Sequence, residues 1–201
     1  MTLQSLHDFW KEEIVKKRLF VINLLDADDT FCTSEFKKLK GIHDQNQASL
    51  SPDFIQKLKD AKPFAWTSKG GIFWWIGDMN VVVTGRPEEH RETTLEWFYK
   101  HFTFAESGKR RFSFISVRWN DQLESDDASY KDYYTRKSGM LYDLACKWHQ
   151  VLDDSNIHHV INVIEDDANV LRMLNNRIVN KMEGLFSWIV KNGEMPVKYE
   201  E

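Results

Sequence analysis

The sequence has few of the residues that mark unusual classes of protein. It contains only 2 Cys, 9 Gly and 4 Pro among 201 residues. The small glycine and proline content excludes a collagenous or low-complexity chain. Cys32 and Cys146 lack the paired spacing of a disulfide framework or a zinc knuckle. This cysteine use is typical of a reducing compartment, and we expect a cytoplasmic location, with the nucleus as the alternative.

Long apolar runs and an excess of basic residues are also missing. Apolar runs of about seven residues are far shorter than the roughly 20 residues that a membrane-spanning helix needs. The polar residues 1–5 do not resemble a secretory signal. With 31 acidic and 27 basic residues the formal charge is −4, which argues against the broadly basic surface of a dedicated duplex-binding module. We expect no membrane contact and no obligate protein partner.

Four short apolar runs have the pattern of buried strands. They lie at residues 19–25, 79–84, 112–117 and 158–164. Most are continuous rather than alternating, as in parallel strands that are covered on both faces. Helical patterns surround them at residues 3–18, 51–60, 88–102, 130–152 and 169–190. This alternation predicts an α/β fold: a three-layer, Rossmann-like fold with a mainly parallel central sheet and helices on both faces.

The chain is long enough to bury a core, and it reads as one domain over residues 1–201. The interval 31–78 is too long for a simple crossover, and it predicts a small, cap-like insertion with a helix and several aromatic residues. Residues 169–201 are expected to form a C-terminal helical segment. Within the insertion, Trp74 and Trp75 either pack in the core or stack on a substrate.

Polar residues follow every predicted strand. Ligands of open α/β sheets bind outside the carboxyl ends of the strands, so these positions are candidates for a site. They are Asp26, Asp28 and Thr30 after the first strand, Thr84, Gly85 and Arg86 after the second, Arg118 to Asp121 after the third, and Glu165, Asp166 and Asp167 after the fourth.

Carboxylates gathered at one edge of a sheet repel one another unless a cation neutralises them. Asp26, Asp28 and Asp166 are therefore candidate ligands for Mg²⁺, which prefers oxygen atoms and keeps part of its shell open to a phosphate. Such a cluster supplies one carboxylate as a nucleophile and another as a general acid and base. In the alternative interpretation these are ordinary turn residues, and Asp166 or Asp167 caps the last helix.

The strand ends resemble the four motifs of the haloacid dehalogenase (HAD) superfamily of phosphohydrolases. The first motif, Asp-x-Asp-x-Thr, lies in LFVINLLDADDTF, and the second, a threonine, in VVVTGRPEEH. Lys137 fits the third motif best, with Lys131 and Arg136 as competitors. The fourth, an acidic pair, lies in VINVIEDDANVL, as Glu165-Asp166 or as Asp166-Asp167.

The long insertion with its Trp-Trp pair, followed by Thr-Gly-Arg, narrows this resemblance. It is similar to the HAD domain of Swiss Army Knife RNA-repair-like proteins and, more distantly, to the phosphatase domain of polynucleotide kinase phosphatases. The insertion would overhang the strand ends, where Trp74 and Trp75 would contact a substrate.

The resemblance implies a role for each matching residue. Asp26 would attack phosphorus and carry an aspartyl phosphate, and Asp28 would protonate the leaving oxygen and then activate water. Thr84 and Lys137 would hold the phosphoryl oxygens, while Asp166 would be the distal Mg²⁺ ligand, supported by Glu165. Thr30, Gly85, Arg86 and Asp167 would support the site or the substrate.

The predicted function is Mg²⁺-dependent hydrolysis of a phosphomonoester, and the resemblance favours a nucleic-acid 3′ end or a nucleotide as the phosphorylated substrate. One alternative is a phosphatase of small metabolites or phosphoproteins, because the core motifs do not choose the substrate. A second is a non-catalytic HAD-fold binding protein. His43, His90, His158 and His159 show no metal-ligand spacing, and no role is predicted for them.

Overall fold

A computed structural model describes residues 4–33, 51–68, 75–102, 112–117, 126–178 and 182–200, with the backbone alone for residues 126–132. Its centre is a six-stranded sheet in the order β3-β2-β1-β4-β5-β6. The strands are β1 (Phe20–Leu25), β2 (Met79–Thr84), β3 (Phe112–Ser116), β4 (His159–Glu165), β5 (Leu185–Ile189) and β6 (Val197–Lys198). Every neighbouring pair is parallel except β5 and β6.

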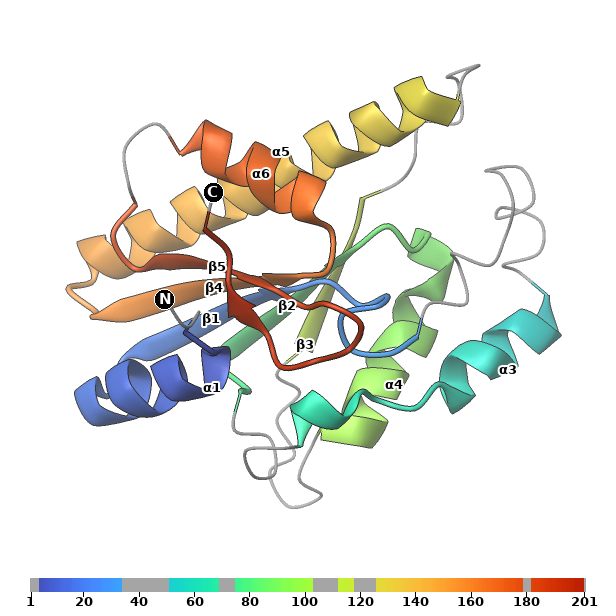
Figure 1. The fold of residues 1–201 in the computed structure, drawn as a ribbon, viewed down its shortest axis with the longest axis horizontal. Helices are drawn as coiled ribbons and strands as arrows, with labels where there is room; N and C mark the ends of the chain where they lie inside the picture. Colours follow the sequence, from blue (N-terminus) through green and yellow to red (C-terminus); the bar gives the residue numbers. More distant parts are fainter. Residues whose placement is uncertain are drawn as a thin grey trace.

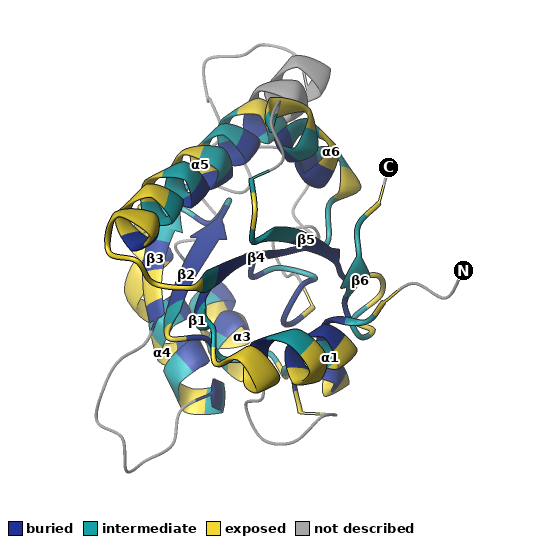
Figure 2. Ribbon diagram, turned by 90° about the vertical axis from the view of Figure 1, so that its left-hand side faces the viewer, coloured by how far each residue is buried: buried dark blue, intermediate teal, exposed yellow. Residues whose placement is uncertain are grey.

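Helices cover both faces of the sheet (Figures 1 and 2). They are α1 (Leu6–Phe9), η1 (Trp10–Val15), α3 (Pro52–Asp60), η3 (Ala65–Thr67), η4 (Glu88–His90), α4 (Arg91–Phe102), α5 (Asp126–Asp154) and α6 (Ala168–Arg177). In Figure 2, α5 and α6 lie above the sheet, whereas α1, α3 and α4 lie below it. The predicted three-layer α/β fold with a mainly parallel sheet is confirmed.

The two faces of the sheet bury two separate apolar clusters, because successive side chains of a strand point to opposite faces. Val21 and Leu25 of β1 belong to the cluster that includes α1 and α4. Ile22 and Leu24 belong to the cluster that includes α5 and α6. The strands are continuously apolar because both of their faces are buried, as we predicted from the sequence.

A row of buried asparagines crosses the middle of the sheet. Asn23 of β1 donates from Nδ2 to Oδ1 of Asn80 on β2 at 2.9 Å and to the carbonyl oxygen of Trp75 at 2.8 Å. Asn162 of β4 donates from Nδ2 to Oδ1 of Asn23 at 3.1 Å, and Trp188 Nε1 of β5 donates to Oδ1 of Asn162 at 2.9 Å. Four neighbouring strands are therefore joined through side chains as well as through the backbone.

The helix predicted over residues 169–190 is wrong in its second half, and so is the C-terminal helical segment. Helix α6 ends at Arg177, and Leu185–Ile189 forms β5, which pairs with β4. A short apolar run such as this one cannot be assigned to a helix or a strand by periodicity alone. Gly184 precedes β5 with a φ of 82°, a backbone conformation that favours glycine.

The other helices begin and end close to the predicted positions. Ser51 caps α3 by accepting a hydrogen bond from the Phe54 backbone N–H, and Pro52 occupies the first helical position.

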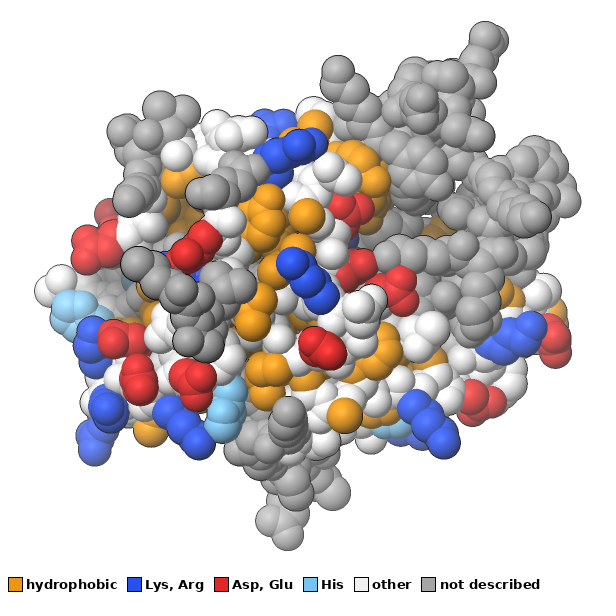
Figure 3. Space-filling model, in the orientation of Figure 1, with side chains coloured by type: hydrophobic (Ala, Val, Ile, Leu, Met, Phe, Trp, Pro, Cys, Tyr) orange, Lys and Arg blue, Asp and Glu red, His pale blue; other side chains and the backbone are white. Residues whose placement is uncertain are grey.

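Along the described part of the chain, no helix combines the length and the apolar character needed to cross a bilayer. Acidic and basic side chains are interspersed over the face in Figure 3, as expected from the small net charge. The division into one domain with a cap-like insertion stays a prediction.

Candidate active site

Three acidic side chains meet at the carboxyl ends of β1 and β4. Asp26 directly follows β1, and its backbone N–H donates to the carbonyl oxygen of Ile164 at 2.9 Å, so the two strands end side by side. Each of Asp26, Glu165 and Asp166 offers one carboxylate oxygen to a group in which all such atoms lie within 4.8 Å of one another. The expectation that Asp26 and Asp166 lie within reach of one cation is confirmed.

Lys137 of α5 lies against this group. Its Nζ is 2.6 Å from Oδ1 of Asp26 and 2.8 Å from Oε2 of Glu165, and all three side chains are buried. The alternation along β4 explains the contact. Glu165 shares a face with Ile161 and Val163, which pack in the α5 cluster. Among the three candidates for the third motif, Lys137 contacts two of the acids, and the side chain of Lys131 lies outside the described residues. The assignment of Lys137 to the motif stays a prediction.

Burial and mutual repulsion shift the ionisation of this group. Burial raises the pKa of Asp26 to about 6, with Asp166 and Asp28 adding to the rise and Lys137 opposing it. Burial and the neighbouring Asp26 also raise the pKa of Glu165 well above its ordinary value. Burial disfavours the Lys137 ammonium, yet Asp26 and Glu165 hold the pKa of Lys137 well above its usual range. The lysine therefore stays charged.

The Thr30 hydroxyl bridges two of the acids. Its Oγ1 lies 3.2 Å from Oδ2 of Asp26 and 3.5 Å from Oδ1 of Asp166. The Thr30 carbonyl oxygen accepts a hydrogen bond from Nε1 of the buried Trp66 at 3.0 Å. The turn after β1 is thus fixed by a contact with the insertion, and the Thr30 hydroxyl contacts two of the acids. Its predicted role in supporting the site stays a prediction.

Asp28 has a different partner from the one that we expected. Its carboxylate accepts two hydrogen bonds from Arg86, from Nε to Oδ2 and from Nη2 to Oδ1, each at 2.8 Å. The Asp28 carboxylate therefore lies outside the group of Asp26, Glu165 and Asp166, and its role as a metal ligand stays a prediction. A buried guanidinium needs a carboxylate partner, and Asp28 supplies it.

Arg86 is held on several sides. Its Nη1 donates to Thr94 Oγ1 of α4 at 3.1 Å, and its carbonyl oxygen accepts from Ser116 Oγ of β3 at 2.7 Å. Its Nη2 also lies 3.9 Å from the buried Cys32 sulfur. Burial raises the pKa of the Cys32 thiol to about 12, so this thiol stays protonated.

The end of β2 contributes Thr84 and Gly85. The buried Thr84 hydroxyl accepts a hydrogen bond from the Arg86 backbone N–H at 3.2 Å. A Cβ atom added to Gly85 would lie 3.0 Å from the Tyr133 hydroxyl. Tyr133 therefore packs closely on the strand end, and its ring centroid is 5.7 Å from Lys137 Nζ. Sequence reasoning missed Tyr133, although its i, i+4 spacing from Lys137 on one helix was a usable signal.

The two registers of the fourth motif are separated by geometry. Glu165 and Asp166 belong to the acidic group around Asp26. Asp167 instead caps α6, where its Oδ1 accepts a hydrogen bond from the Asn169 backbone N–H at 2.9 Å. The pair at the site is Glu165-Asp166, and the capping alternative describes Asp167.

Of the two adjacent tryptophans in the insertion, the structure describes Trp75. Trp75 is fully buried, its ring centroid lies 4.8 Å from that of Phe31, and its Nε1 donates to the Thr67 carbonyl oxygen at 3.0 Å. The prediction that Trp75 contacts a substrate is corrected, because the ring packs in the core. Trp74 lies outside the described residues, as does the segment Arg118 to Asp121.

Comparisons with known proteins add little to this geometry. No family model matches the chain, and no curated protein sequence matches it. Among solved structures, the class C acid phosphatase from Bacillus anthracis with tungstate bound is similar to it over 89% of this chain and 72% of that chain, with 10% identity and a TM-score of 0.37. A TM-score of this size is too low to establish a shared fold. The fold of this chain is defined by its own sheet topology.

Proposed function

We propose that the protein is a Mg²⁺-dependent phosphomonoester hydrolase of the HAD type. The observation that carries the proposal is the group formed by Asp26, Glu165 and Asp166 at the carboxyl ends of two parallel strands. The Lys137 ammonium forms ion pairs with two of these carboxylates. The proposal is supported by the order of the four sequence motifs along the chain, three of which supply the residues of this group and its lysine.

The donor set suits a hard divalent cation. Three carboxylates and one ammonium carry a formal charge of −2 when all are ionised, and the Asp28–Arg86 pair adds none. The available ligand atoms are all oxygens, the donors that Mg²⁺ prefers. Asp26 and Asp166 would hold the ion with Glu165 beside them. When bound, Mg²⁺ would offset the repulsion between these carboxylates and an anionic phosphate.

Asp26 is the proposed nucleophile. Lys137 Nζ fixes Oδ1 and the Thr30 hydroxyl contacts Oδ2, so the carboxylate is oriented before the substrate arrives. A bond would form from an Asp26 oxygen to phosphorus while the bond from phosphorus to the ester oxygen breaks, which gives an aspartyl phosphate. Water would then attack this phosphorus, release inorganic phosphate and restore the carboxylate.

Asp28 is the proposed proton donor to the leaving oxygen and acceptor from the attacking water. Each oxygen of Asp28 accepts one hydrogen bond from Arg86, and a carboxylate oxygen has a second lone pair that can take a proton. The Asp28 side chain is 15% exposed, whereas that of Asp26 is 6% exposed. Lys137 and Thr84 would stabilise the charge on the phosphoryl oxygens.

The substrate class follows from two opposed observations. The motif resemblance supports a nucleic-acid 3′ end or a nucleotide. Burial of Trp66 and Trp75 removes both rings as stacking platforms for bases, which favours the alternative of a small phosphorylated metabolite or a phosphoprotein. We retain the 3′-phosphorylated end as the first substrate to test, and a cytoplasmic location stays a prediction.

A generic aryl phosphate tests the activity without assuming the substrate. We expect Mg²⁺-dependent release of phosphate that EDTA abolishes and that Asp26→Asn lowers by several orders of magnitude. Asp154→Asn, which changes an exposed acid at the far end of α5, should keep the wild-type rate. Absence of turnover in the wild-type protein would favour a non-catalytic binding protein.

A substrate panel then separates the two classes. It compares kcat/KM for a 3′-phosphorylated oligonucleotide with kcat/KM for sugar phosphates, nucleotides and a phosphopeptide. A preference for the oligonucleotide supports the nucleic-acid assignment. An oligonucleotide that is hydrolysed no faster than the aryl phosphate would refute it and leave the phosphatase activity intact.

A further inference from the structure

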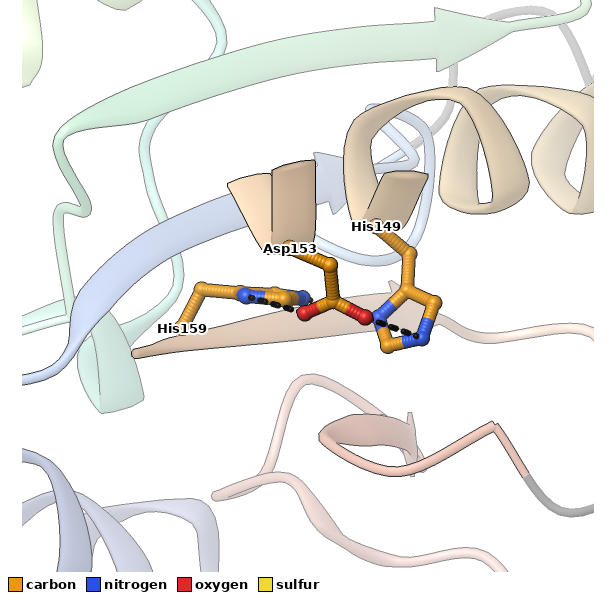
Figure 4. A group of neighbouring side chains, drawn as sticks. All are labelled: His149, Asp153 and His159. Carbon is orange, nitrogen blue, oxygen red and sulfur yellow. Dashed lines mark hydrogen bonds and ion pairs between the residues drawn. The ribbon is translucent and has the colours of Figure 1, made fainter. Parts of the chain in front are cut away.

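A second group of side chains that could hold a metal ion lies at the amino-terminal end of β4. His149 and Asp153 belong to the last turns of α5, and His159 is the first residue of β4 (Figure 4). Glu165 is the last residue of the same strand, so this group is about 20 Å from the acids of the candidate active site at roughly 3.3 Å per residue. The two groups are separate.

The three side chains converge closely. His149 Nδ1 lies 2.9 Å from His159 Nε2, and His149 Nε2 lies 3.2 Å from Oδ2 of Asp153. His159 Nδ1 lies 3.8 Å from Oδ1 of Asp153. Each residue offers one ligand atom, and all three atoms lie within 4.8 Å of one another. Figure 4 shows the carboxylate of Asp153 directed between the two rings.

The hydrogen bonds of His159 fix which ring nitrogen is available. Its Nδ1 lies 2.9 Å from the carbonyl oxygen of Ile157, which can only accept, so Nδ1 carries the hydrogen. The Nε2 of a neutral His159 then presents its lone pair to His149. A histidine whose other ring N–H donates to a backbone carbonyl is typical of metal ligands, because that bond fixes the tautomer and the ring orientation.

The remaining contacts leave two ring nitrogens facing each other. If His149 Nε2 donates to Oδ2 of Asp153 at 3.2 Å, then His149 Nδ1 and His159 Nε2 face each other as two lone pairs at 2.9 Å. A metal ion that binds both lone pairs removes this unfavourable contact. Two imidazoles and one carboxylate are ligands that zinc and similar transition metals accept readily.

We propose that His149, Asp153 and His159 form a binding site for a divalent transition metal, with zinc as its representative. His149 Nδ1 and His159 Nε2, which lie 2.9 Å apart, need to separate by only a few tenths of an ångström, since two Zn–N bonds of about 2.0–2.1 Å at a tetrahedral angle place their nitrogens about 3.3 Å apart. The His159 side chain is 5% exposed, whereas those of His149 and Asp153 are 28% and 57% exposed. The site is therefore anchored in the fold and open to entry from solvent.

A metal here would fasten the end of α5 to the start of β4. Lys137 lies on that helix and Glu165 on that strand, so the metal would hold together the two elements that build the acidic group. The sequence assigned no role to His159. The available signal was the i, i+4 spacing of His149 and Asp153, whereas the contact with His159 depends on the turn between helix and strand.

Calorimetric zinc titration of the full, metal-stripped chain in excess Mg²⁺ tests the proposal. Mg²⁺ occupies sites made of oxygen ligands and competes poorly for imidazole. We expect one equivalent of zinc to bind and to raise the melting temperature. His149→Ala and Asp153→Asn should each weaken zinc binding at least tenfold. The matched controls His158→Ala and Asp154→Asn replace neighbouring exposed residues and should bind zinc like the wild type.

Thermal unfolding without zinc checks that each variant folds, and Asp153→Asn should leave the fold intact because its side chain is largely exposed. Zinc binding that is absent in the wild type, or that is equal in wild type, His149→Ala and Asp153→Asn, would overturn the proposal. Neither outcome bears on hydrolysis of phosphate esters, which the aryl phosphate assay measures separately.

Discussion

The guanidinium of Arg86 and the carboxylate of Asp28 form a two-point ion pair, with both nitrogen–oxygen distances at 2.8 Å. The pair joins the turn after β1 to the turn after β2. It also sets Asp28 apart from Asp26, two residues earlier, whose partner is Lys137. Two carboxylates of one short motif are thus fixed by two different cations.

Removal of Arg86 should destabilise the protein strongly. Arg86→Met leaves the Asp28 carboxylate without its buried partner, and breaking a buried pair in this way costs about 3–5 kcal/mol. The free energy of unfolding from urea titration measures this cost. Lys17→Met is the control, because it removes an exposed pair with Glu13, which is worth about 1 kcal/mol or less. Similar losses in the two variants would mean that the Asp28–Arg86 pair contributes little.

Asp26→Asn should stabilise the metal-free protein at neutral pH. The pKa of Asp26 rises from 3.8 to about 6, with burial as the main cause. The folded state therefore binds more protons than the unfolded state between these values, so the free energy of unfolding falls as pH rises from about 4 to about 6. The expected fall is on the order of 1–3 kcal/mol. Urea unfolding at several pH values should show it in the wild type and a smaller fall in Asp26→Asn; equal slopes would contradict the prediction.

Asp166→Asn and Asp167→Asn should separate metal binding from helix capping. Saturating Mg²⁺ at about 100 times its dissociation constant stabilises a protein by roughly 2.7 kcal/mol. We therefore expect Mg²⁺ to raise the melting temperature of the wild type and of Asp167→Asn, but not that of Asp166→Asn. Asp167→Asn keeps a side chain that can cap α6, so its own stability should change little. A gain that survives in Asp166→Asn would exclude that residue as a ligand.

Asn23→Leu should cost about 2–6 kcal/mol. The substitution leaves the Trp75 carbonyl oxygen without its Asn23 donor and Asn162 Nδ2 without its Asn23 acceptor, and each buried polar group that loses its partner costs about 1–3 kcal/mol. Asn176→Leu, at an exposed position on α6, is the matched control and should change the free energy of unfolding by less than about 0.5 kcal/mol. Equal effects of the two substitutions would show that the asparagine row is energetically neutral.

Much of the fold could be predicted because its strands are covered on both faces. Continuous apolar runs identified β1 to β4, and the rule that parallel strands end at one edge was sufficient to bring Asp26 and Asp166 together from the sequence alone. Strand β5 was missed because its apolar run follows a helix without a strong break in periodicity. Trp188 of this strand is fully buried in the core.

The partners of the site residues could not be read from the sequence. Asp28 and Arg86 are 58 residues apart, and Lys137 and Asp26 are 111 apart. Such contacts depend on how helices lie over the sheet, which periodicity does not specify. For the same reason the sequence left three candidates for one motif lysine and two registers for one acidic pair.

The buried asparagines have a consequence for the precision of the acidic group. Asn23 and Asn162 are paired across β1 and β4, and each lies three residues before the acid at its strand end, Asp26 or Glu165. A slip of one residue between the strands would break the amide row and turn one acid to the opposite face of the sheet. The asparagine pair thus fixes the register of β1 and β4 in the middle of the sheet. Because both spacings are three residues, the same register places Asp26 and Glu165 side by side at the carboxyl ends of the strands.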